Sequence, residues 1–160
     1  MGETDASETA RRLVEANRYM TLATADAGGR PWASPVWYAP VGDAEFLWVS
    51  DPEARHSRNI AVRPEVAIVI FDSTVPVGDA EAVYCDAVAE ELAGSALDVG
   101  IAAFSRHSEA GGAKAWGPAD VSPPARLRLY RATVTSRSVL GPGDRRLPVS
   151  PRSAGSRRAR

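Results

Sequence analysis

Groups suited to binding an anion are concentrated between residues 48 and 59, in the run Trp-Val-Ser-Asp-Pro-Glu-Ala-Arg-His-Ser-Arg-Asn. A strand followed at once by a helix would place Arg55 and His56 in the first two helical turns, where free N–H groups and the helix dipole favour negative charge. Arginine adds a planar donor fork that suits phosphate oxygens. Asp51 and Glu53 place negative charge at the same end, so the spacing by itself also suits a solvent-exposed helix of mixed charge.

A second candidate binding segment is the run Arg-Pro-Trp-Ala-Ser-Pro-Val-Trp-Tyr over residues 30–38. Proline inside a strand removes a ladder donor and marks an edge or a bulge. Pro35 beside Ser34 would leave backbone groups free for the polar edge of a planar ligand, or would simply form an irregular edge strand. Tryptophans could stack on a ring or fill the core; the chain has four, at Trp32, Trp37, Trp48 and Trp116.

Several enzyme classes are excluded by the motifs that the chain lacks. It contains no G-x-S-x-G, no Walker lysine loop, no G-x-G-x-x-G, no H-E-x-x-H and no C-x-x-C. Two histidines and one cysteine are too few for a structural zinc site, so no metal is expected. Cys85 is expected to be a small core residue, and a single cysteine forms no internal disulfide, which favours the reducing cytoplasm. No apolar run approaches the roughly 18 residues that span a bilayer, and the acidic N-terminus lacks the features of a signal peptide, so no membrane association is expected.

The charge of the chain is divided unevenly along its length. The net charge of the 160 residues is −1, but residues 1–125 carry 9 basic and 19 acidic side chains, whereas residues 126–160 carry 10 arginines and a single acidic residue. A basic tail can contact nucleic acid, and it can equally be a solvated chain end. The acidic body makes nucleic acid an unlikely ligand, because neutralising phosphates requires a basic face.

Hydrophobic periodicity predicts a mainly β (α+β) chain with six strands and about three short helices. The strands are expected at 19–25, 32–39, 45–50, 66–72, 81–92 and 126–137, and the helices at about 7–18, at 52–62 and from 95 onward, with 107–125 as loop. Asp51, and Ser95 together with Asp98, are expected to cap the second and third helices. The run 66–72 is expected to be buried on both faces, and the last strand to contain a bulge near Leu129.

Successive antiparallel hairpins of this kind favour a small closed β-barrel with peripheral helices, because closure removes exposed strand edges. The length suits one domain, expected over residues 1–149. Residues 1–6 are expected to be frayed, and residues 150–160 to form a disordered basic tail.

Three runs in a fixed order carry a resemblance to a known family. They are Tyr-Met-Thr-Leu-Ala-Thr-Ala from Tyr19, Gly-Arg-Pro-Trp-Ala-Ser-Pro-Val-Trp-Tyr from Gly29, and Glu-Ala-Arg-His-Ser-Arg-Asn-Ile-Ala-Val-Arg-Pro-Glu-Val-Ala-Ile-Val from Glu53. Together they resemble the pyridoxamine 5′-phosphate oxidase-like family over roughly residues 8–135. The resemblance implies a six-stranded antiparallel split β-barrel, and a homodimer that holds FMN at the subunit interface.

The resemblance also implies which residues of this chain contact the cofactor, from the positions that match the family's motif. Arg55 and His56 would hold the FMN phosphate, and Ser50 would support it. His56 stands where relatives commonly have lysine, so phosphate affinity would fall as pH rises and the imidazole loses its proton. The remaining implied cofactor contacts are the backbone of Ser34, Pro35, Val36 and Trp37, the backbone of Trp48 and Val49, and Trp116, which lies in a region where the second subunit often contributes.

The resemblance indicates an FMN-binding oxidoreductase that acts on an unidentified small molecule. It assigns no catalytic residue; Tyr38, Tyr84 and Ser34 are polar groups expected to face the pocket. Two alternatives use the same barrel, an F420-dependent reductase and a non-catalytic flavin-binding or interaction module. The C-terminal segment does not match the substrate-phosphate segment of true pyridoxamine phosphate oxidases, so vitamin B6 oxidation is not expected.

Overall fold

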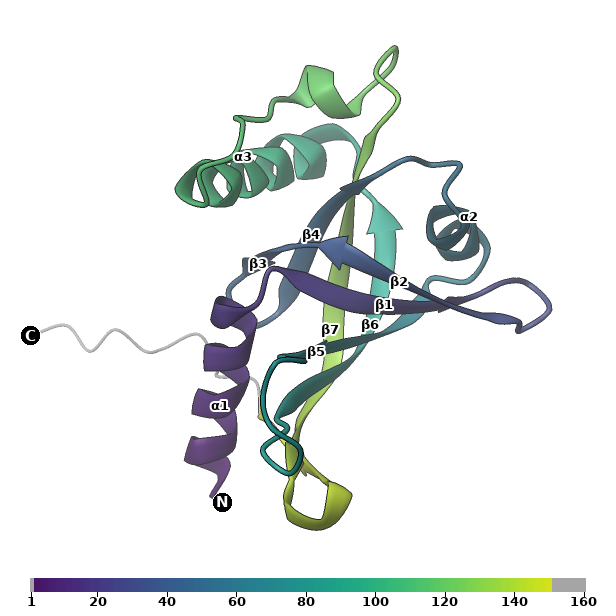
Figure 1. Cartoon of the computed structure of the whole chain (residues 1–160). Helices are drawn as coiled ribbons and strands as arrows, with labels where there is room; N and C mark the ends of the chain where they lie inside the picture. Colours follow the sequence, from purple (N-terminus) through teal and green to yellow (C-terminus); the bar gives the residue numbers. More distant parts are fainter. Residues whose placement is uncertain (1, 151–160) are drawn as a thin grey trace, which may run out of the picture.

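The computed structural model describes residues 2–150, which form one eight-stranded antiparallel sheet with three α-helices around it (Figure 1). The strands run in the order β2-β1-β5-β6-β7-β4-β3, with β8 paired to β7. No ladder among the described residues joins the end strands β2 and β3, so the sheet curls into a split barrel and not the closed barrel that periodicity alone favours. The strands are β1 (Tyr19–Ala25), β2 (Pro31–Trp37), β3 (Ala39–Val41), β4 (Glu45–Ser50), β5 (Glu65–Phe71), β6 (Ala82–Glu91), β7 (Arg128–Gly141) and β8 (Arg145–Pro148); the helices are α1 (Glu3–Ala16), α2 (Arg55–Val62) and α3 (Gly94–Ala110). None of these helices combines the length and apolar character needed to cross a bilayer.

The β1–β2 hairpin pairs Tyr19 with Trp37 at its open end and Ala25 with Pro31 next to its turn. Its turn is fixed by the Asp26 carboxylate, which accepts hydrogen bonds from the backbone N–H groups of Gly28 and Arg30, both at 2.9 Å. Gly29 adopts a left-handed φ of 84°, which glycine reaches without steric cost. β2 stands at the end of the sheet, so the prediction of an edge strand around Pro35 is confirmed.

The core consists of two clusters on opposite faces of the strands. One fills the barrel and includes Met20, Phe46 and Trp48; the other lies beneath α3 and includes Leu47 and Leu129. Neighbouring residues on β4 therefore serve different clusters, as expected for side chains that alternate across a strand.

The expectation that residues 66–72 are buried on both faces is wrong. Along β5, burial alternates, with Val66, Ile68 and Ile70 inside the barrel and Ala67 and Phe71 exposed. The reason is that no described helix packs over the outer face of this strand, so an apolar surface lies open there.

Helix α1 begins at Glu3, not at Ser7, so most of the stretch expected to be frayed is helical. The backbone N–H of Gly2 donates to the Asp5 carboxylate at 3.1 Å, which supports the helix start. At the other end, the Tyr38 hydroxyl donates to the Val14 carbonyl at 2.7 Å. Residue 1 and the predicted tail beyond residue 150 lie outside the described residues.

Both predicted helix caps are corrected by the structure. α2 begins at Arg55 because Asp51 instead accepts the backbone N–H of Glu53 in a preceding turn, at 2.9 Å. α3 follows Ala93 with no side-chain cap among the described residues, so the Ser95–Asp98 pair is no capping box. α3 also continues to Ala110, well into the segment expected to be loop.

The last long strand, β7, does contain a bulge, but further along than predicted. Asp86 pairs with Ser136 and Ala87 with Val134, which leaves Thr135 as the extra residue. The change of inward-facing residues near Leu129 has another cause, since β7 is covered on both faces there: Leu129 packs under α3 and Tyr130 inside the barrel. β3 and β8 were not predicted because three- and four-residue strands carry too little periodicity.

Gly100 allows α3 to approach the sheet closely. A Cβ at this position would lie 2.7 Å from Leu92 Cδ1 and 3.1 Å from Leu129 Cδ2, and both leucines are buried. Gly100→Ala would gain about 1 kcal/mol of helix propensity but incur about 1–3 kcal/mol of overpacking. We therefore expect a lower free energy of unfolding in urea titrations. Asp98→Ala, at an exposed position of the same helix, is the control; equal stabilisation by both changes would contradict the prediction.

Candidate functional site

The two segments singled out in the sequence meet where β4 ends and α2 begins. Ser50, the last residue of β4, places its Oγ 2.6 Å from Nε2 of His56. The Arg55 guanidinium lies over the Trp32 ring, 4.3 Å from its centroid. Trp32 Nε1 in turn donates to Ser34 Oγ at 2.9 Å, so β2 and the start of α2 are joined through side chains.

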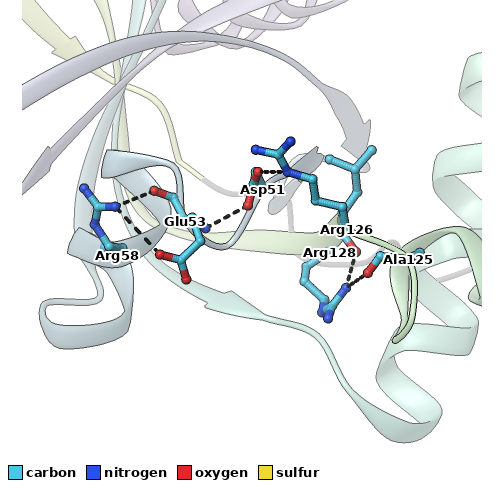
Figure 2. Close-up of polar contacts among 7 residues, drawn as sticks. Asp51, Glu53, Arg58, Ala125, Arg126 and Arg128 are labelled. Atoms are coloured by element: carbon cyan, nitrogen blue, oxygen red, sulfur yellow. Dashed lines mark hydrogen bonds and ion pairs between the residues drawn. The ribbon is translucent and has the colours of Figure 1, made fainter.

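The acidic residues of the connecting turn are already paired. The Asp51 carboxylate accepts hydrogen bonds from the backbone N–H of Glu53 and from Arg126 Nε (Figure 2), and these contacts, the backbone bond first, lower the pKa of Asp51. Arg58 Nη1 donates to the Glu53 carbonyl at 2.7 Å and lies 3.9 Å from the Glu53 carboxylate. The two negative charges that counted against anion binding are therefore balanced by arginines other than Arg55.

The start of α2 offers backbone donors in addition to these side chains. The first N–H groups of a helix have no intrahelical acceptor, and no side chain in the described part of the chain caps them. The first turn runs from Arg55 to Arg58 and contains no acidic residue. A buried hydrogen bond from Asn59 Nδ2 to Thr24 Oγ1, 2.9 Å long, ties the helix to β1 and fixes its direction.

His56 is half-buried, and this burial lowers the pKa of its imidazole below the ordinary value. The neutral ring is therefore favoured near pH 7 when no anion is present. A phosphate beside the ring would favour the protonated form, so His56 would couple the binding of such an anion to proton uptake.

The other residues predicted to contact the cofactor do not gather in one place: some lie in the barrel core, some beneath α3 and one on the surface of β2. Trp48 is fully buried and stacks on Tyr130 inside the barrel, with ring centroids 5.7 Å apart, so only its backbone could reach a ligand. Trp37 and Trp116 both pack edge-on against Phe104 of α3, with centroid distances of 5.2 and 5.6 Å. Among the remaining predicted residues, Val36 is buried in the barrel, Val49 is partly buried beneath α3, and Pro35 is exposed on β2.

Of the two tyrosines expected at the pocket, one is directed elsewhere, and the other, Tyr84, lines a groove on the outer face of the sheet. Tyr38 is 1% exposed and its hydroxyl is bonded to the end of α1, so it does not face the site. Tyr84 lies on the outer face of β6 beneath the Arg146 guanidinium, 3.9 Å from the ring centroid.

Three residues that organise the site were not predicted as members of it. Trp32 shares a face of β2 with Ser34, which the two-residue period of a strand could have indicated. Asn59 follows the basic run directly and stands within the same motif. Arg126 is 75 positions away from Asp51 and carries no local signal, so only the fold reveals their pairing.

Comparison with known proteins supports a relationship over most of the chain. A family model described as pyridoxamine 5′-phosphate oxidase matches residues 6–137. Among solved structures, a haem-binding protein from Mycobacterium smegmatis is 25% identical with a TM-score of 0.70, and the match covers 90% of this chain and 57% of that one. The chain therefore spans little more than half of the mycobacterial protein.

Two further structures share the fold at lower identity. HutZ, a haem storage protein from Vibrio cholerae, is 20% identical over 81% of this chain and 89% of its own, with a TM-score of 0.62. An F420 reductase is 20% identical over 80% of this chain and 94% of its own, with a TM-score of 0.59. A search of curated proteins found no match.

Proposed function

Because the chain belongs to the pyridoxamine 5′-phosphate oxidase family, we propose that it is an FMN-binding oxidoreductase that acts on a small molecule. The observation that carries this proposal is the contact of Ser50 with His56, next to the Arg55–Trp32 contact, at a helix start whose neighbouring carboxylates are already paired. This donor set suits a phosphomonoester. FMN, when bound, would supply the redox chemistry, while the protein binds and orients it.

Arg55 can hold a phosphate without leaving Trp32. Stacking uses the flat face of the guanidinium and leaves its N–H edge available for bidentate hydrogen bonds. Ser50 and the first N–H groups of α2 would complete the phosphate site. The free edge of β2 would offer backbone groups to the isoalloxazine, and the exposure of Ala33 and Pro35 leaves that edge open.

We propose a homodimer that uses the open outer face of the sheet. The apolar part of this face consists of Ala67, Val69 and Phe71 on β5, with Ala23 on β1 beside them. A groove of about 340 Å³ runs over it. An apolar strip of this kind on a soluble domain is typical of a protein interface, and it would bring a second copy close to the hairpin that contains Trp32.

Haem is a second candidate ligand. The mycobacterial haem-binding protein supports it, being 25% identical over nine-tenths of this chain. Histidine is a common axial ligand of haem iron. His107 is exposed, and its ring lies 5.4 Å from that of Trp37, so this imidazole would be accessible to a haem.

The visible spectrum of purified protein, followed by titrations with FMN, F420 and haem, separates these proposals. We expect a flavin spectrum or stoichiometric uptake of FMN. Tighter binding of F420, or a Soret band with no flavin uptake, would replace the FMN proposal. Bound FMN that no electron donor reduces would leave a flavin-binding module without oxidoreductase activity.

The pH dependence of FMN binding tests the role of His56. Protonated imidazole attracts phosphate, so affinity should fall as pH rises through the pKa of His56, which burial lowers. Lysine stays charged to about pH 10, so His56→Lys should bind FMN more tightly above neutral pH and with a flatter profile. The phosphate's own ionisation affects both proteins equally, so the ratio of their affinities isolates the side chain. Parallel pH profiles in FMN fluorescence titrations would contradict this role.

A further inference from the structure

A buried arginine lies at the end of the barrel closed by α1. The Arg137 side chain, on β7, is 8% exposed, and its Nε has no hydrogen-bond partner among the described residues. The carboxylate of Asp43 lies 3.9 Å from Arg137 Nη1, and the Cys85 thiol is another polar neighbour. Buried charges are normally paired closely and fully hydrogen-bonded. The Nη1 group of Arg137 lies beyond hydrogen-bond distance of Asp43 and is therefore available to an anion.

A cavity of about 90 Å³ adjoins this guanidinium. Arg11 of α1 also lines it, with the hydroxyl-bearing Ser7 one turn earlier on the same helix. Val134 and Val149 supply an apolar wall. The cavity belongs to the α1 side of the molecule, and Figure 1 shows α1 and α2 on different sides of the barrel, so it is distinct from the proposed FMN site.

Charge and size restrict what this cavity would accept. Two guanidiniums and the Asp43 carboxylate give a net charge of +1, which matches a monoanion better than a phosphate dianion. A cavity of about 150 Å³ accommodates benzene, so the smaller volume here admits only a few heavy atoms. We propose that the cavity binds a short-chain monocarboxylate, with its carboxylate on Arg11 and Arg137 and its alkyl group against Val134 and Val149.

Calorimetric titration of the full chain with propionate tests this site. We expect saturable one-to-one binding, and Arg11→Ala should weaken it about 10- to 100-fold, the loss typical of a hydrogen bond between charged groups. Arg12→Ala is the matched control, because Arg12 pairs with Glu81 at 2.7 Å and does not line the cavity. Both variants should bind FMN like the wild type, so this test is independent of the proposed FMN site.

Three results would overturn the proposal: no saturable binding of propionate, equal affinity in Arg11→Ala and wild type, or tighter binding of inorganic phosphate than of propionate. Arg137→Lys keeps the charge but loses the planar fork, and it should also weaken binding. If that variant does not fold, the comparison of Arg11→Ala with Arg12→Ala still tests the proposal, because Arg11 is only partly buried and Arg12 is exposed.

Discussion

Arg55→Ala is expected to weaken FMN binding about 10- to 100-fold, because it removes a hydrogen-bonding cation from the proposed phosphate site. The substitution also removes the guanidinium stacked on Trp32, so the β2 side of the site loses an anchor. Backbone donors at the start of α2, together with Ser50 and His56, would account for the affinity that remains. Quenching of FMN fluorescence on titration with protein measures the change directly.

Arg58→Ala provides the matched control on the same helix. Its guanidinium contacts Glu53 (Figure 2), and both side chains are exposed to solvent, so releasing the Glu53 charge should lower FMN affinity much less than the loss of Arg55. Equal losses in the two variants would show that general positive charge is responsible, and not the geometry of Arg55. Retention of full affinity in Arg55→Ala would place the phosphate elsewhere.

Ala67→Arg is expected to convert the proposed homodimer into a monomer. Ala67 is exposed at the centre of the open β5 face, and an arginine there would bury an unpaired charge in the interface, at a cost of several kcal/mol. Since FMN is proposed to bind at that interface, its affinity should fall as well. Sedimentation velocity reports the change in mass, and the flavin titration reports the change in binding.

Val99→Arg controls for this substitution. Val99 is 73% exposed on α3 and lies away from the β5 face, so its replacement adds the same charge without touching the proposed interface. The variant should sediment like the wild type. A wild-type protein that sediments as a monomer at all concentrations, or an Ala67→Arg variant that stays dimeric, would contradict the proposed interface.

The strands were predicted well where one face is buried and the turn is short. The register of the β1–β2 hairpin follows from local chemistry, since the Asp26 turn fixes the pairing. Burial of β5 was mispredicted because Val, Ile and Ala on an outer face give the same composition as a fully buried strand. Whether another element covers the outer face of β5 depends on tertiary packing, and the local sequence pattern does not predict it.

Within the candidate site, contacts between residues close in sequence could be predicted, whereas contacts between distant residues could not. Ser50 and His56 are joined across one turn, and the strand–turn–helix pattern indicates their proximity. The placement of Trp37 and Trp116 against Phe104 depends on where α3 lies, and α3 itself was longer than predicted. Asp51 places negative charge at the helix end expected to bind an anion, and its pairing with Arg126 balances that charge. This pairing depends wholly on tertiary structure.

The single cysteine makes this chain a convenient system for following its own unfolding. Cys85 lies in the middle of β6, is 3% exposed, and has its thiol pKa raised by burial. Thiolate is the reactive form, so a disulfide reagent should label the native state extremely slowly. Labelling would then require disruption of the central sheet. Its rate, monitored by mass spectrometry, should equal the rate of global opening when the reagent outpaces reclosing, and should follow the population of the open form when it does not. Rapid labelling under native conditions would instead reveal a local opening of β6.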